Sequence, residues 1–393
     1  MKLQYKHTIF ACFTGYVAQA AVNNFLPLLF VFFGSEYGIP LSTVTLLITF
    51  NFILQLTTDL VSPGIVGRIG VRAGVVAAQG LAAAGFLALA VLPGLIPPFP
   101  ALLTSVALYA VGGGLLEVLV SPIVEACPGD NKEGTMSLLH SFYCWGQVGV
   151  VLLSTGFFAL AGIRNWRILA AIWSLLPLGG ALLFTRVPIA PLVPEGERSM
   201  TVRELLGTKL FWVFCLLMVC AGASELTVSQ WASAFAERGL GVDKTLGDLA
   251  GPMFFAAMMG LSRLLYGKFS KKLQLAKALP LTCLLCIGCY LLIALAPWPA
   301  VGLLGCGICG FSVGILWPGT FSMAAATLRR GGTAMFAYLA LAGDLGCCLG
   351  PTLAGQAAGL FGDSLQTGIL LATLFPALML AGVGLHRRLT AKK

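Results

Sequence analysis

The chain has 393 residues, of which 58% are hydrophobic and only 10% are charged, and its mean hydropathy is +0.93. A soluble domain carries roughly a quarter charged residues, so this chain has too few charged side chains to cover a large soluble globule. The composition therefore predicts an integral membrane protein.

Polar or Pro/Gly-rich breaks divide the chain into twelve apolar stretches, each of which reaches the roughly 20 residues that a helix needs to cross a bilayer. In chain order, the predicted spanning helices cover residues 8–33, 42–66, 73–92, 99–124, 136–161, 166–187, 209–235, 245–266, 273–296, 300–327, 333–360 and 365–385. The first stretch is too long for the apolar region of a cleavable signal peptide, so we expect a spanning helix there. The sequence thus predicts an all-α membrane protein with twelve transmembrane helices and both termini on one side.

The positively charged residues are distributed unevenly over the predicted loops. Four of the 24 Lys and Arg residues, namely Arg164, Arg167, Arg238 and Lys244, fall on the side away from the termini. The other 20 fall on the terminal side, and the positive-inside rule makes that side cytoplasmic. The net charge of +9 is therefore a topology signal. We expect a multi-pass protein of the cell inner (plasma) membrane, with both termini cytoplasmic and no nucleic-acid partner.

The longest hydrophilic segment, "RVPIAPLVPEGERSMTVRELLGTK" at residues 186–209, divides the predicted helices into two sets of six. We expect an N-terminal six-helix half at 1–187, a cytoplasmic linker at 188–208 and a C-terminal six-helix half at 209–393. The halves share a weak repeat, because "GLLEVLVSP" at 114–122 matches "GFSVGILWP" at 310–318. Two pseudo-symmetric halves are typical of secondary transporters, whose substrate site lies where the halves meet.

Polar and aromatic side chains recur at helical spacing on several predicted helices, and such faces turn away from lipid. Amides that bond hydroxyl groups and rings that stack on a solute suit a binding site. An Asn or Gln that only bonds across two helices is the alternative at each position. The candidate substrate-binding residues are Gln19, Asn23, Asn24, Glu117, His140, Tyr143, Gln147, Gln230, Trp231 and Trp317.

Glu117 lies about midway along the fourth predicted helix, where a carboxylate is costly to insert. Its counterpart in the repeat is Val313, so the scaffold does not need a carboxylate at this point. A buried carboxyl group can hold a proton in a dry site and release it when the site is wetted, which is the requirement for proton coupling. Glu225 and Asp344 are the further candidates for proton coupling, and Asp344 alternatively caps or kinks its helix near Pro351.

Charged residues near the cytoplasmic ends of helices are candidate gating residues, with packing or snorkelling to the membrane surface as the alternative. They are Asp59, Arg68, Arg72 and Arg263. We expect no metal site, because the run Cys283, Cys286, Cys289 forms one face of a helix without a nearby His or carboxylate. We also expect neither an enzyme nor a cofactor, since the sequence shows no nucleophile–base pair and no phosphate-binding loop.

Four segments carry a resemblance to a known family: "VNNFLP" on helix one, "GGGLLEVLVSP" on helix four, "MSLLHSFYCWGQ" on helix five and "GASELTVSQW" on helix seven. With its two sets of six helices, the chain resembles the major facilitator superfamily and, within it, the fucose permease-like branch of sugar:proton symporters. The resemblance implies a central cavity, rocker-switch alternating access and a proton-binding carboxylate on helix four that matches Glu117. It also implies sugar-binding positions on helix five that match His140 and Tyr143.

The chain departs from the family pattern at two places. Asn23 stands where the branch has a further carboxylate on helix one. In the cytoplasmic loop, "GRIGVR" at residues 67–72 has Gly67 where the superfamily has Asp, and Asp59 lies two turns earlier.

The leading hypothesis is a secondary active transporter that imports a small polar solute, a sugar or sugar-like compound, by proton-coupled symport. The alternative is a proton-driven exporter of amphiphilic or cationic compounds, in which Glu117, Glu225 and Asp344 would pair with a cation. A receptor or lipid-handling protein of the same fold is a third class. A sodium gradient could replace the proton gradient. We expect a monomer in the lipid bilayer, with a small-molecule solute as its partner.

Overall fold

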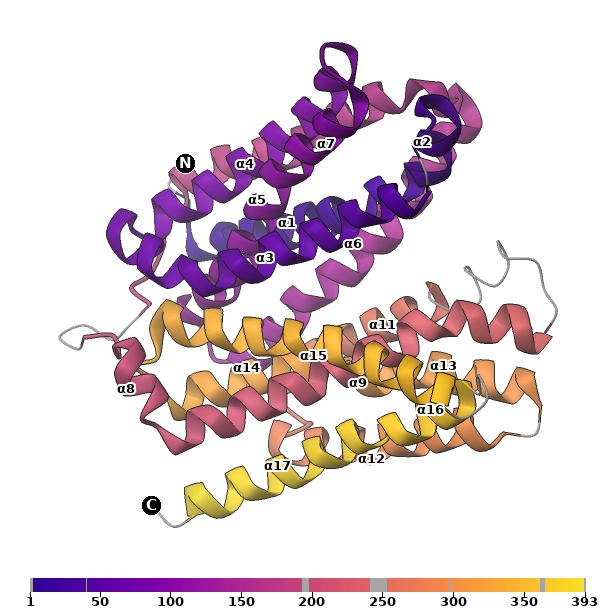
Figure 1. Ribbon diagram of the computed structural model, residues 1–393. Coiled ribbons are helices and arrows are strands. Elements are labelled where there is room, and N and C mark those ends of the chain that lie inside the picture. Colours follow the sequence, from indigo (N-terminus) through magenta and orange to yellow (C-terminus); the bar gives the residue numbers. More distant parts are fainter. Residues whose placement is uncertain are drawn as a thin grey trace. The chain divides into compact units, whose positions relative to one another are not determined.

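Residues 3–39, 41–192, 198–240, 253–296, 298–360 and 365–391 are described by a computed structural model. Within these ranges every regular element is a helix, as Figure 1 shows. The long helices are α1 (Tyr5–Asn24), α3 (Leu41–Ile69), α4 (Val71–Val91), α5 (Pro98–Ala126), α6 (Lys132–Ala161), α7 (Trp166–Arg186), α9 (Lys209–Leu240), α11 (Phe254–Phe269), α12 (Leu275–Leu295), α13 (Pro299–Val313), α14 (Leu316–Thr327), α15 (Gly332–Leu360) and α17 (Leu374–Ala391). The shorter ones are α2 (Phe30–Tyr37), α8 (Val202–Leu206) and α16 (Leu365–Ala372), with 3-10 turns η1 (Leu26–Leu29), η2 (Leu92–Gly94) and η3 (Ile163–Asn165).

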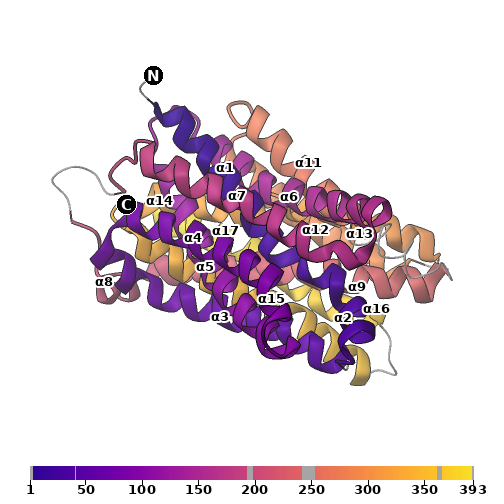
Figure 2. The ribbon, with the colours of Figure 1, turned by 90° about the horizontal axis from the view of Figure 1, so that it is seen from above.

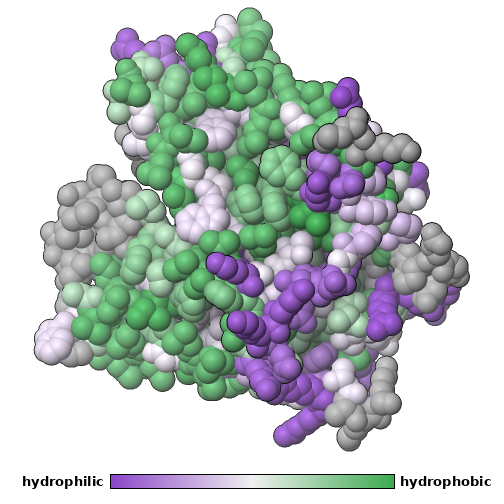
Figure 3. Space-filling view, turned by 180° about the vertical axis from the view of Figure 1, so that it is seen from behind, coloured by the Kyte–Doolittle hydropathy of each residue, from purple (hydrophilic) through white to green (hydrophobic). Residues whose placement is uncertain are grey.

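The predicted all-α membrane fold is confirmed. Among the described residues, 10 helical segments are long and apolar enough to cross a membrane. The two other predicted spans, 42–66 and 245–266, coincide with α3 and, in its described part, with α11. Hydrophobic residues dominate the face drawn in Figure 3, and outward side chains such as Leu160 and Leu281 are 92% and 67% exposed. Such a surface requires lipid rather than water around it.

Three predicted spans, the first, the tenth and the twelfth, are each divided into two helices, so the structure differs there from the continuous helices expected. The breaks fall at η1, at Gly314–Ile315 and at Thr373. Each lies at or within four residues of a proline, namely Pro27, Pro318 and Pro376. Proline has no N–H, and its ring clashes with the carbonyl four residues earlier. The freed backbone groups must find other partners inside the membrane.

By the contacts among its residues, the chain forms two compact units. Unit 1 comprises Met1–Pro128, Trp145–Glu195 and Gly332–Ala337, and unit 2 comprises Gly129–Cys144, Gly196–Gly331 and Tyr338–Lys393. The first part of α6 therefore groups with unit 2, and the rest of this helix groups with unit 1. The division into the sequence halves 1–187 and 209–393 stays a prediction.

In unit 1, α4 packs against α5 and α7, and α1 packs against the same two helices. Figure 2 shows α1 beside α7 from above. Aromatic rings fill the interior, since Phe33 meets the edge of Trp166 at 5.1 Å between centroids and Phe86 stacks on Tyr109 at 5.7 Å. A Cβ on Gly112 of α5 would lie 2.6 Å from a backbone carbonyl oxygen of α4. This glycine therefore allows a close helix crossing of the kind common in membranes.

In unit 2, α9 packs against α13, α14 and α17, while α11 packs against α13. Gly310 of α13 leaves no space for a Cβ against the carbonyl of Phe255 on α11. The corresponding glycine in unit 1 is Gly114 of α5, where a Cβ would lie 3.2 Å from the Cα atom of Gln55 on α3. The sequence repeat at Gly114 and Gly310 therefore marks equivalent helix crossings.

Candidate functional site

A polar layer lies between α1 and α5 in unit 1. Gln19 donates a hydrogen bond from Nε2 to Oε2 of Glu117 over 2.6 Å. The hydroxyl groups of Tyr16 and Ser121, one turn away on each helix, are 3.0 Å apart. Residues three or four apart lie on one face of a helix, so the polar faces of α1 and α5 meet along this line. Gln19 is buried and Glu117 is partly buried.

An amide cluster joins α1 to α3 in the same unit. Asn23 accepts hydrogen bonds at Oδ1 from Gln55 over 2.7 Å and from Asn51 over 3.2 Å. Asn24, by contrast, donates to a carbonyl of its own helix over 2.9 Å. The structure thus adds Asn51 and Gln55 to the candidate site residues and shows a local, within-helix bond for Asn24.

A buried ion pair lies in unit 2, where Arg263 of α11 donates from Nη2 to Oε2 of Glu225 on α9 over 3.0 Å. Arg263 is only 3% exposed, so it does not snorkel to the surface in this structure. Burying two charges is costly unless further hydrogen bonds complete their surroundings. Such bonds are present, because Nε donates to the Gly314 carbonyl over 2.7 Å and Nη1 donates to Cys144 Sγ over 3.1 Å.

The bond from Arg263 to Gly314 has a specific cause in the sequence. Gly314 lies at the break between α13 and α14, four residues before Pro318. Because proline has no N–H, the Gly314 carbonyl cannot receive its usual bond from the next helical turn. Arg263 supplies a donor from another helix and so satisfies a buried carbonyl that would cost about 1–3 kcal/mol if left without one.

A line of hydrogen bonds, which we call the α6–α11 seam, joins the first part of α6 and the preceding Asn131 to α11 and the following Ser270 within unit 2. Its bonds run from Ser270 Oγ to Asn131 Oδ1 (2.7 Å), from Tyr266 OH to Glu133 Oε2 (3.0 Å), from Ser137 Oγ to the Arg263 carbonyl (2.8 Å) and from Arg263 Nη1 to the His140 carbonyl (3.3 Å). Two glycines allow the approach, since a Cβ on Gly267 would lie 3.1 Å from the Gly134 carbonyl oxygen. The seam therefore combines side-chain bonds with close backbone packing.

Aromatic residues of α14 lie beside this seam. The His140 and Phe321 rings are 5.8 Å apart between centroids, and Trp317 meets Phe321 edge-on at 6.1 Å. Trp317 is buried and occupies the space that a Cβ on Gly343 of α15 would need. Two candidate substrate-binding residues, His140 and Trp317, are thus linked through Phe321.

The remaining candidates for substrate and proton binding lie on α6, α9 and α15. Tyr143 and Gln147 of α6 and Asp344 of α15 are partly buried. Gln230 and Trp231 belong to α9, but their side chains lie outside the described residues.

The gating candidates differ in their surroundings. Asp59 of α3 is fully buried. Arg68, in the last turn of α3, and Arg72, in the first turn of α4, are exposed, and Arg72 donates from Nη1 to the Phe184 carbonyl over 2.7 Å. This bond satisfies one of the last carbonyls of α7, which have no partner in their own helix.

Several residues that complete these clusters were not among the predicted site residues. They are Asn51, Gln55, Ser121, Ser137, Cys144 and Gly314. Helical spacing places Ser121 on the same polar face as Glu117, one turn away, and Pro318 could have indicated the Gly314 carbonyl. The pairing of Arg263 with Glu225 has no signal in the sequence.

Comparisons with known structures agree with this fold. The chain is similar to the E. coli fucose:proton symporter FucP, with a TM-score of 0.79 at 15% identity over 96% of this chain and 98% of that chain. It is also similar to the proton:xylose symporter XylE, with a TM-score of 0.77 at 14% identity over 95% and 94% of the two chains. The human organic anion transporter MFSD10 gives a TM-score of 0.73 at 15% identity over 96% and 99%. At such low identity these similarities show the fold.

The family itself is shown by the sequence. No curated protein matches the chain. A family model described as Major Facilitator Superfamily, however, matches residues 9–351, which is most of the chain. The protein is therefore a membrane transport protein that belongs to the Major Facilitator Superfamily.

Proposed function

We propose that this transporter imports a small polar solute, a sugar or sugar-like compound, together with a proton. The observation that carries the proposal is the hydrogen bond between Gln19 and Glu117 inside the polar layer of unit 1. Carboxyl groups within spanning helices are costly, and those that occur commonly serve proton relays or ion pathways.

Gln19 suits both protonation states of Glu117. Its Nε2 atom donates to the carboxylate, and its Oε1 atom is buried without a hydrogen-bond partner among the described residues. A protonated carboxyl group has one O–H donor, and rotation of either side chain would bring that donor to Oε1. The pair can therefore hold the carboxyl group with or without its proton, as a cycle of loading and release requires.

The amide cluster of Asn23, Asn51 and Gln55 supports a solute rich in hydroxyl groups. Side-chain amides both donate and accept hydrogen bonds. The bonds among these three amides can therefore be replaced by bonds to a solute. Asn51 Oδ1 is buried without a hydrogen-bond partner among the described residues, which leaves the cluster an acceptor for a hydroxyl group. Tyr143 and Trp317, which belong to unit 2, stay predicted solute-binding residues.

The names of two similar structures support this solute class, since FucP is a fucose:proton symporter and XylE is a proton:xylose symporter. MFSD10 is an organic anion transporter, and an anionic solute needs an available cation in the site. Arg263 is a buried cation in the described spans, but each of its three guanidinium nitrogens already donates to protein groups. This arrangement favours a neutral solute over an organic anion.

The proposed cycle uses alternating access. Solute and proton bind together, and the loaded carrier then opens its site to the cytoplasm. Release of the proton from Glu117 lets the empty carrier return to the outward-open state. If the sequence halves 1–187 and 209–393 move as bodies, the α6–α11 seam has to open, because α6 belongs to the first half and α11 to the second. Asp59, Arg68, Arg72 and Arg263 are the proposed gating residues.

The alternative of a proton-driven exporter would use carboxylates to bind a cationic compound. Glu225 is poorly suited to this role, because Arg263 already compensates its charge. Glu117 and Asp344, both partly buried, would be the remaining candidates.

Solute-driven proton movement in liposomes tests the proposal. Purified protein is reconstituted around a pH-sensitive dye, and sugars, organic anions or cationic compounds are added outside without a pH gradient. Symport predicts acidification of the lumen with a sugar, whereas export by antiport predicts alkalinisation with a cationic compound. Sugar uptake that requires sodium and leaves the lumenal pH unchanged would show that the coupling ion is sodium instead of a proton.

A further inference from the structure

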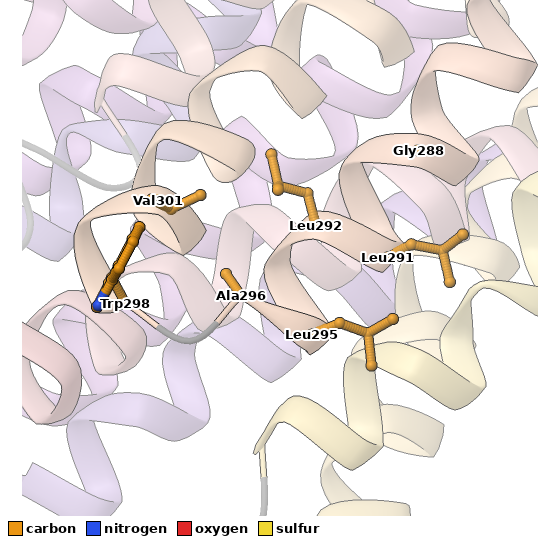
Figure 4. A pocket seen from close by; sticks show the side chains of 7 residues that line it. All are labelled: Gly288, Leu291, Leu292, Leu295, Ala296, Trp298 and Val301. Atoms are coloured by element: carbon orange, nitrogen blue, oxygen red, sulfur yellow. The ribbon is translucent and has the colours of Figure 1, made fainter.

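A crevice opens on the exposed side of unit 2 between the end of α12 and the start of α13. Its volume is about 380 Å³, and its walls include Gly288, Leu291, Leu292, Leu295, Trp298 and Val301 (Figure 4). The side chains of this lining are hydrocarbon except for the indole N–H of Trp298. A polar solute would find no hydrogen bonds here, so the crevice is not suited to the cargo proposed for the transporter.

Leu292 and Gly288 contribute to the lining of the crevice in different ways. Leu292 of α12 packs against α13, since a Cβ placed on Gly305 of α13 would lie 3.4 Å from the Cδ2 atom of Leu292. Gly288 contributes no side chain, and a Cβ placed there would have no neighbour within 4 Å. Both helices belong to segments that are long and apolar enough to span the membrane, so the medium at the mouth of the crevice is lipid hydrocarbon.

We propose that the crevice binds one acyl chain of a membrane phospholipid, with the lipid glycerol region at Trp298. An unfilled apolar space loses the dispersion contacts of its lining atoms, and a flexible hydrocarbon chain can follow its irregular walls. Leu295 and Trp298 form the rim and are 65% and 69% exposed, so a chain can enter from the side.

Trp298 defines the orientation and the leaflet of the lipid. Tryptophan is enriched where spans leave the hydrocarbon region, and its N–H faces the headgroup level. There the indole can donate to an ester or phosphate oxygen while its ring covers the first methylenes. Trp298 lies at the end of α12 opposite to Lys271 and Lys272, so the bound lipid belongs to the leaflet away from those lysines.

Photo-cross-linking in a bilayer tests this site without reference to transport. The protein is reconstituted with a phosphatidylcholine that carries a diazirine on one acyl chain, irradiated and mapped by peptide mass spectrometry. We expect cross-links on α12 and α13 around the crevice to exceed those on Leu175 and Leu182, which are exposed on α7.

Two filling variants and a matched control make the test specific. Gly288→Phe and Val301→Trp each place a large ring in the lining of the crevice. Each variant should reduce cross-linking at the crevice to the level measured at Leu175 and Leu182 of α7. Gly384→Phe places the same ring at an exposed glycine of α17 that also has no neighbour within 4 Å, and it should leave the cross-links unchanged. Cross-linking that simply follows exposure, or that persists in both folded filling variants, would overturn the proposal.

Discussion

Arg263 donates from Nε to the carbonyl oxygen of Gly314 over 2.7 Å, and it thereby completes the helix break that Pro318 creates. The same guanidinium group pairs with Glu225 and donates to the His140 carbonyl. A single side chain thus connects α6, α9, α11 and the break between α13 and α14. Unit 2 therefore depends on a buried charge for its internal packing.

Removing this charge should destabilise the protein strongly. Arg263→Met leaves Glu225 without its cation and the Gly314 carbonyl without its donor, and loss of one partner of a buried ion pair costs about 3–5 kcal/mol. Arg263→Lys should have an intermediate effect, because an ammonium group cannot reproduce the planar fork of the guanidinium. Thermal unfolding of the purified variants in detergent measures both.

An exposed ion pair provides the control for Arg263. Arg198 pairs with Glu204 at the surface, and their side chains are 64% and 38% exposed. Arg198→Met should change the free energy of unfolding little, because water and salt screen an exposed ion pair. The double change Arg263→Met with Glu225→Leu should recover part of the lost stability, since no buried charge remains. Equal losses of Tm for Arg263→Met and Arg198→Met would contradict this view of unit 2.

The α6–α11 seam should have to open during transport. Asn131 and Ser270 are joined by a 2.7 Å bond, so the pair Asn131→Cys and Ser270→Cys should form a disulfide under mild oxidation. We expect the cross-linked protein to lose solute exchange and a reductant to restore it, while the single variants are insensitive to oxidant. Undiminished exchange by protein whose cross-link is verified by mass spectrometry would rule out the seam as a moving contact.

Gln79 of α4 is expected to lower the stability of unit 1. It is fully buried, and neither Nε2 nor Oε1 has a hydrogen-bond partner among the described residues. The backbone of Gly180 on α7 lies so close that a Cβ there would be 2.5 Å from Nε2. Gln79→Met keeps a flexible chain but removes the polar atoms, so it should stabilise the fold by about 1–3 kcal/mol.

The comparison for Gln79 is Gln19→Met, which removes the donor to Glu117 and should lower Tm. Opposite shifts of Tm for the two Gln→Met variants are the expected result in thermal unfolding. A lower Tm for Gln79→Met would show that its amide has a stabilising partner.

Glu204 should make the short helix α8 sensitive to acid. Its carboxylate accepts a hydrogen bond from the Thr201 backbone N–H over 2.7 Å and pairs with Arg198. These bonds lower the pKa of Glu204 to about 2, and the backbone bond has the largest effect. Because the folded pKa lies below the ordinary value of 4.5, the stabilisation is complete above that value and is lost as the pH falls toward the folded pKa.

Hydrogen exchange of the α8 amides, corrected for the intrinsic rate, measures this effect. Protection should be constant from about pH 8 to about pH 5 and should decrease below about pH 4. Glu204→Gln should reduce protection at neutral pH and remove the acid dependence. Protection that rises on acidification would have the wrong sign for a carboxylate held in its charged form.

The helices could be predicted from the sequence because each span has to present about 20 apolar residues to lipid. The polar face of α1 was also predictable, since Gln19 and Asn23 are one turn apart. The break at Gly314 was missed, although Pro318 signals it, because hydropathy alone does not register a lost backbone bond.

The contacts between helices could not be predicted in the same way. Helical spacing defines which face of a helix is polar, but the partner of that face depends on how several helices pack. Glu117 could have met any inward-facing donor, and it meets Gln19. Arg263 looked like a residue near a membrane surface, but it is buried and bonds to groups of α6, of α9 and of the break between α13 and α14.

Glu117 is the proposed site of proton coupling, and the substitution Glu117→Gln tests this role most directly. Glutamine has the size and hydrogen-bonding capacity of the protonated acid but cannot release a proton. Glu125→Gln, two turns along the same helix, is the matched control. Exchange of labelled solute between equal concentrations and accumulation driven by a pH gradient are measured in the same liposomes. We predict that Glu117→Gln exchanges solute but does not accumulate it, whereas Glu125→Gln does both. Gradient-driven accumulation at the normal rate by a well-folded Glu117→Gln protein would contradict the central claim.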